Sequence, residues 1–170
     1  MELAELIRSR RTHKAYAPQA VDRATLDELF ELARWAPNHN LTNPWRFRVL
    51  GPEALERLKR AAGPEAAVKL ERAPTLVAAS VVQTGEDPIA DAEDRDAAAC
   101  ACYIVLLAAH ERGLGGYWRT PGVLRTPEGR AACGIPDGEV ELALLHLGEA
   151  RGSKPAPERA PLEAVVTHLS

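Results

Sequence analysis

The chain has 170 residues, of which 46% are hydrophobic and 26% charged, and its formal net charge at pH 7 is −3. These values are ordinary for a globular protein, and we expect a single domain over residues 1–170 with a substantial core. The acidic balance argues against a protein that wraps nucleic acid, because such a protein usually carries a basic surface.

No segment of the sequence predicts export or membrane insertion. Glu2 and Glu5 lie where a secretory signal would be basic. The longest apolar stretch, residues 97–109, is shorter than the roughly 20 residues of a membrane span. The three cysteines are too few for a disulfide framework and are expected to be buried, reduced thiols. We therefore expect a cytoplasmic protein with no membrane partner.

Hydrophobic patterns predict helices and strands that are intermixed without regular alternation. Helices are expected near residues 3–7, 25–33, 53–60 and 91–112, and strands near residues 45–50, 75–82 and 139–148. The second helix has two candidate N-caps, Asp22 and Thr25, and Pro37 stops it. Gly115 and Gly116 are interpreted as part of a helix end and a tight turn. The mixture favours a layered α+β domain over a doubly wound parallel sheet.

Familiar catalytic motifs are absent from the sequence. The glycines near residue 115 form neither a dinucleotide-binding fingerprint nor a phosphate-binding P-loop, and no Gly-x-Ser-x-Gly elbow indicates a hydrolase. The five histidines are scattered without the spacing of a metal site. We therefore predict neither a metal site nor a catalytic side chain.

Residues 8–14, called the basic segment below, concentrate positive charge in an otherwise acidic chain. They read Arg-Ser-Arg-Arg-Thr-His-Lys and follow the first predicted helix. Arginine presents a rigid fork of donors that matches phosphate oxygens, and threonine adds a neutral donor. Cations also gain from the dipole at a helix C-terminus, so a solvated, charged helix end is an equally good interpretation of this segment alone.

Two further segments combine aromatic and polar side chains. His39 lies between Trp35 and Trp45 in a polar loop, and residues 116–120 read Gly-Tyr-Trp-Arg-Thr. A tryptophan alone is most simply a core residue, but an arginine beside aromatic rings suits a planar, anionic ligand. Together with the basic segment, these residues describe a site for a flat, phosphorylated cofactor.

With these segments in this order, the sequence resembles the nitroreductase-like flavoprotein family, in particular its short, minimal branch. Residues 7–16 match the family's opening pattern, Ile-x-x-Arg-Arg-Ser-x-Arg-x-Phe, with conservative changes at its last three fixed positions. Residues 35–39 and 43–47 are similar to the second block, and residues 115–120 to the third. Residues 159–166 are similar to the C-terminal block, in which a basic residue precedes Pro-Leu-Glu-Glu-Val-Val.

The resemblance implies a three-layer fold, with a mixed, mostly antiparallel sheet flanked by helices. It also implies an intertwined homodimer with FMN at the subunit interface, and contacts from the basic segment and the tail to the FMN phosphate. Trp35 and His39 would approach the flavin of the partner subunit. The full set of implied cofactor-binding residues is Arg10, Arg11, Thr12, Lys14, Trp35, His39, Trp118, Arg119, Thr120 and Arg159.

The resemblance further implies a ping-pong reaction, in which NADPH or NADH reduces FMN and a nitroaromatic or quinone-type acceptor then takes the electrons. Two alternatives are a flavin-binding sensor or carrier without efficient turnover, and related flavin chemistry such as reductive dehalogenation. A nucleic-acid-binding module that uses the basic segment is disfavoured by the net charge. Asn43 replaces the family's usual glutamine, and the short stretch between Arg60 and Pro74 predicts a more open active site.

Overall fold

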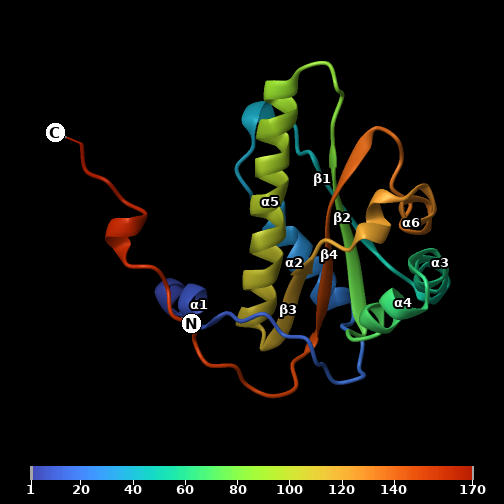
Figure 1. Ribbon diagram of the computed structural model, residues 1–170. Helices are drawn as coiled ribbons and strands as arrows, with labels where there is room; N and C mark the ends of the chain where they lie inside the picture. Colours follow the sequence, from blue (N-terminus) through green and yellow to red (C-terminus); the bar gives the residue numbers. More distant parts are fainter. Residues whose placement is uncertain (1, 170) are drawn as a thin grey trace.

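A four-stranded antiparallel sheet forms the centre of the computed structural model, which describes residues 2–169 (Figure 1). From one edge to the other, its strands are β1 (Trp45–Val49), β2 (Thr75–Val82), β4 (Glu139–Glu149) and β3 (Leu114–Arg119). An isolated parallel bridge between Thr12 and Gly116 extends the sheet beyond β3. The expected mixed, mostly antiparallel sheet is confirmed.

The strands differ in burial because helices cover the middle of the sheet on both faces. β2 is buried along almost its whole length, as its apolar run predicts. β1 lies at an edge of the sheet and alternates, as predicted. Trp45 and Phe47 pack into the core on one face, whereas Arg48 points to the other. There its guanidinium donates to Ser80 of β2 and to Glu139 of β4, each at 2.8 Å, which ties β1, β2 and β4 together.

Helices α5 (Pro88–Glu111) and α2 (Arg23–Ala33) cover one face of the sheet. α5 is the long core helix that the sequence predicts, and its buried side consists largely of alanine, which allows close packing on the strands. Asp22 is the N-cap of α2, because its carboxylate accepts a hydrogen bond of 2.9 Å from Thr25 N. This contact decides between the two candidate N-caps.

Helices α3 (Pro52–Ala62), α4 (Pro64–Leu70) and α6 (Pro127–Ala132) cover the opposite face. Each has proline in its first turn, where the missing N–H costs no hydrogen bond. Leu58, Leu70 and Leu144 are fully buried in the core between these helices and the sheet. The three expected layers are confirmed, although the sequence patterns do not predict the short helices α4 and α6.

Strand β3 corrects the interpretation of the glycines as a helix end and a turn. Gly113, with a φ of 76°, does end α5. Gly115 and Gly116 instead lie within β3 and are buried. A Cβ on Gly116 would lie 2.7 Å from Leu106 Cδ2 of α5, so the glycine allows strand and helix to approach closely. Hydrophobic periodicity does not reveal such a strand.

The two ends of the chain lie outside the three layers. α1 (Leu3–Ser9) packs beside α5, and residues 151–169 form an exposed tail that includes the short turn η3 (Leu162–Ala164) (Figure 1). Two other short turns are η1 (His39–Leu41) and η2 (Gly122–Arg125). Cys102 and Cys133 are buried as expected, whereas Cys100 faces outward on α5 and is exposed. None of the helices in residues 2–169 has the length and apolar character to cross a membrane.

Candidate functional site

The first two residues of the basic segment end α1, and the segment then leaves the helix and runs along the outer edge of β3. Thr12 pairs with Gly116, and His13 N donates to Gly116 O at 3.2 Å. The hydroxyl of the buried Tyr16 donates to the carbonyl of His13 at 2.7 Å. These contacts hold the basic segment where α1, β3 and the end of α5 come together (Figure 1).

Four arginines line one hollow of about 480 Å³ beside this segment, which we call the arginine hollow. Three of them belong to the basic segment, and the fourth, Arg159, belongs to the tail. The complete lining is Ile7, Arg8, Arg10, Arg11, Tyr103, Ala156, Pro157 and Arg159, which includes no carboxylate. The structure therefore brings together Arg10, Arg11 and Arg159, which are distant in sequence.

Arg11 and Lys154 fasten the basic segment to the tail. The Arg11 guanidinium donates to the main-chain carbonyl of Arg8 at 2.6 Å and to that of Pro155 at 3.2 Å. In the opposite direction, Lys154 Nζ donates to the carbonyl of Thr12 at 2.7 Å. One side chain from each segment thus forms a hydrogen bond to the main chain of the other.

Arg10 and Arg159 differ from Arg11 in the contacts of their guanidinium groups. Within residues 2–169, no hydrogen bond or ion pair to protein occupies either group. Both side chains border the arginine hollow, one from each segment. Their N–H donors are therefore available to an anion.

The predicted residues of the third segment are divided between the two faces of β3. Trp118 packs against the core beneath α5, whereas Arg119 donates to a main-chain carbonyl of α4 at 3.2 Å on the opposite face. Lys14 Nζ lies 5.8 Å from the centre of the Tyr117 ring, on the Arg119 face because alternate strand residues share a face. Thr120 follows β3 and is exposed.

Trp35 and His39 lie near the opposite end of α5 from the arginine hollow. His39 Nδ1 is 3.8 Å from Glu93 Oε2, early in α5. Ser9, next to the arginines, instead contacts His110 in the last turn of α5. At 1.5 Å per residue, Glu93 and His110 are about 25 Å apart along the helix. Within one chain, the structure does not bring Trp35 and His39 to the other predicted site residues.

Two histidines that the sequence analysis does not select as site residues are His13, within the basic segment, and His110, beside it. Partial burial lowers the pKa of His13 and of His110 below the ordinary value, and the nearby Arg10 guanidinium lowers both pKa values further. The lowered pKa values favour the neutral form of both imidazoles. Lys154 and Tyr103 also shape this region, and neither belongs to a motif in the sequence.

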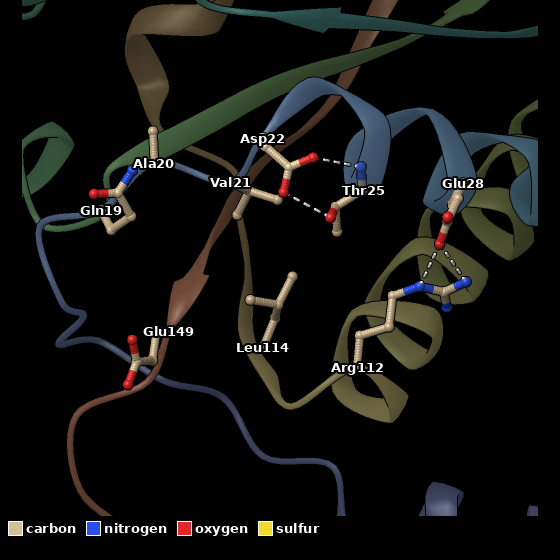
Figure 2. A pocket seen from close by; sticks show the side chains of 9 residues that line it. All are labelled: Gln19, Ala20, Val21, Asp22, Thr25, Glu28, Arg112, Leu114 and Glu149. Carbon is tan, nitrogen blue, oxygen red and sulfur yellow. Dashed lines mark hydrogen bonds and ion pairs between the residues drawn. The ribbon is translucent and has the colours of Figure 1, made fainter.

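A second hollow, of about 430 Å³, lies between the start of α2 and the end of α5 (Figure 2). Asp22 bonds to Thr25 there, and Glu28 forms an ion pair of 3.0 Å with Arg112. The lining is predominantly acidic, because Glu149 adds a third carboxylate against the single arginine. This charge disfavours a phosphate, and no predicted site residue lines the hollow.

The protein-family model of the Nitroreductase family matches residues 7–149, which is most of the chain. The chain belongs to the nitroreductase family. The match includes the basic segment and all four strands of the sheet. The tail, with Arg159, lies beyond the matched residues.

Named relatives and solved structures agree with this membership. The chain is 28% identical to the putative NAD(P)H nitroreductase YfhC of Bacillus subtilis (strain 168), with 98% of this chain and 94% of that protein covered. A nitroreductase-like family protein from Bacillus cereus has a TM-score of 0.89 at 23% identity, covering 99% of this chain and 96% of that one. A putative nitroreductase in complex with FMN from Desulfovibrio desulfuricans has a TM-score of 0.79 at 21% identity, covering 98% and 96%. At these identities, the structural likenesses establish the nitroreductase-like fold.

Proposed function

We propose that this chain is an FMN-dependent NAD(P)H oxidoreductase that holds the FMN phosphate in the arginine hollow. The observation that carries the proposal is the convergence of Arg10, Arg11 and Arg159 on one hollow, in a chain of the nitroreductase family. When bound, FMN would accept a hydride from NADPH or NADH and pass the electrons, in ping-pong order, to a nitroaromatic or quinone-type acceptor.

The donors of the arginine hollow suit a phosphate monoester. Arginine offers planar pairs of N–H donors, and charge-assisted hydrogen bonds to phosphate are about twice as strong as neutral ones. Arg10 and Arg159 have no protein acceptor among residues 2–169, so phosphate binding would not require them to break an existing contact. Arg11 supports them by holding the tail in place, and the Thr12 hydroxyl adds a neutral donor.

Lys14, Arg119 and Thr120 are our proposed contacts to the flavin ring system and ribityl chain. Lys14 and Arg119 share one face of β3, where two positive charges would stabilise negative charge on the flavin. Trp118 would act from the core side, by fixing the position of the strand that carries these residues.

We also propose that a second copy of the chain completes the site. Trp35 and His39 lie about 25 Å along α5 from the arginine end, so they would contact the FMN held by the partner's arginines. Large apolar side chains are exposed around α1, the loop before β1, α5 and the tail, as expected for surfaces that an assembly covers. They include Leu3, Ile7, Trp35, Leu41, Tyr103, Leu162, Val165 and Leu169.

The two buried cysteines are unsuited to nucleophilic chemistry, which is consistent with a reaction carried by the flavin. Burial raises the pKa of the Cys102 thiol to about 12 and that of the Cys133 thiol to about 11. Since the thiolate is the reactive form, both groups are inert at neutral pH. The side chains of this protein would bind, orient and shield the cofactor.

The visible spectrum of the protein after reconstitution with FMN, followed by anaerobic addition of NADPH or NADH, tests this proposal. We expect a yellow protein whose flavin absorbance is bleached by the nicotinamide and restored by a nitroaromatic or quinone. A yellow protein that nicotinamide does not bleach would indicate a sensor or carrier. A colourless protein after reconstitution would overturn the proposal.

A further inference from the structure

His13 of the basic segment and His110 of α5 form a small cluster. His110 lies in the last turn of α5, and its Nε2 is 2.8 Å from Ser9 Oγ, at the end of α1. His13 packs against β3, where a Cβ on Gly115 would lie 3.1 Å from His13 Cγ. Three elements that frame the arginine hollow, namely α1, α5 and the basic segment, therefore meet at these two rings.

The charged groups that act on this cluster are cations. Lys154 of the tail, a protonated His110 and Arg10 act on His13, whereas Arg10 and Arg11 act on His110. Burial is the largest cause of the lowered pKa of each ring, and the cations add repulsion of a protonated imidazole. Where His13 packs against β3, Gly115 brings no charged side chain to the ring. Together, these effects favour the neutral form of both rings before an anion binds.

We propose that a phosphate group bound in the arginine hollow causes His110 and His13 to be protonated from solvent, so that each adds a positive charge beside Arg10. A phosphate monoester carries a charge of about −1.5 to −2 at pH 7, which offsets the repulsion from the surrounding cations. The Ser9 contact survives this change, because a hydroxyl can donate to an unprotonated Nε2 and accept from a protonated one.

This inference rests on the proposed function, because the phosphate concerned is that of FMN. Its consequence is that FMN binding takes up protons at the two histidines. FMN is then bound more tightly as the pH falls from about 7.5 toward the ordinary histidine pKa of about 6.5. Riboflavin, which has the same ring system and no phosphate, should show no such coupling.

The direct test is an NMR titration of the histidine ring protons in the full chain, alone, with FMN and with riboflavin. With FMN, we expect the pKa of His110 and of His13 to rise to at least the ordinary value of about 6.5. With riboflavin, both should stay below that value. The ring signals of His168, which is exposed in the tail, serve as the internal reference in all three samples.

The variant His110→Gln keeps a hydrogen-bonding side chain for Ser9 but cannot take up a proton. In the wild-type chain, FMN affinity should rise between pH 7.5 and pH 6. In the double variant His110→Gln with His13→Gln, this rise should be smaller by a factor of about 3 to 10. The control variant His168→Gln should show the same rise as the wild-type chain. FMN binding without any rise in the pKa of either histidine would overturn the inference and leave the proposed function intact. Failure of FMN to bind would overturn the proposed function, and the inference with it.

Discussion

The two ends of α5 lie beside different groups of side chains, which serve different parts of the proposed site. At its start, Glu93 faces His39 in a hollow that also includes Asp96. At its end, His110 contacts the segment that carries Arg10 and the other cations. Asp91 in the first turn of α5 also gains from the helix dipole, which favours acidic groups at this end of the helix.

The difference between the two ends indicates that one chain carries both halves of the proposed FMN site, but holds them too far apart to form a complete site by itself. The arginine end has donors that no protein group occupies, and the opposite end has Trp35, whose surface is 78% exposed. A rigid helix keeps the two ends about 25 Å apart. Two copies related by a two-fold axis could place the start of one α5 beside the end of the other, which would create two equivalent sites.

Removing charge at the arginine end should have the largest effect. Arg10→Ala removes a charge-assisted contact worth about 1.5–3 kcal/mol, which corresponds to roughly 10- to 150-fold weaker FMN binding by fluorescence titration. The matched control is Arg23→Ala, which removes the same charge from a side chain that is 94% exposed at the start of α2. Equal FMN affinity in the two variants would show that the basic segment is only a charged helix end.

Disturbing the strand that supports the arginine end should have a smaller effect. A Cβ at Gly115 would lie 2.8 Å from Ala150 Cβ, so Gly115→Ala should lower the free energy of unfolding by about 1–3 kcal/mol and weaken FMN binding. The control is Gly122→Ala, where nothing lies within 4 Å of the added atom. Urea denaturation of both variants measures the difference, and similar losses would contradict the close packing of β3.

Combining damage at opposite ends tests whether two chains share each site. One chain carries Arg10→Ala, and the other carries Trp35→Ala together with His39→Ala. The two variant chains can be co-expressed with different tags and purified as a mixed dimer. Shared sites leave one intact site of two, so we expect about one tightly bound FMN per mixed dimer and half the wild-type turnover. Mixed dimers no better than either variant alone would show that each chain forms its own site.

Much of the fold follows from local patterns in the sequence. The apolar run of β2 and the almost wholly apolar second half of α5 predict buried elements, because helices cover both faces of the central strands. β3 is not predicted, since its glycines suit a turn equally well and only their packing against Leu106 and Ala150 explains them. Whether residues 1–170 form a single domain stays a prediction.

The candidate site is predictable only in part. Arginine and threonine in the basic segment indicate a phosphate site. Only the resemblance to a family predicts that Arg159 belongs to the same site as Arg10. No local pattern reports a contact between residues so distant in sequence. His110 and Lys154 escape prediction for the same reason, because their roles arise from tertiary contacts with Ser9 and Thr12. The ten predicted cofactor contacts remain proposals.

The most direct test of the central claim compares the dissociation constants of FMN and riboflavin for the wild-type chain by isothermal titration. The two ligands share a flavin ring and differ in the phosphate that the arginine hollow is proposed to hold. With Arg10 and Arg159 both contributing charge-assisted hydrogen bonds, we predict that FMN binds at least about 100-fold more tightly than riboflavin. Equal affinities for the two flavins would contradict the account.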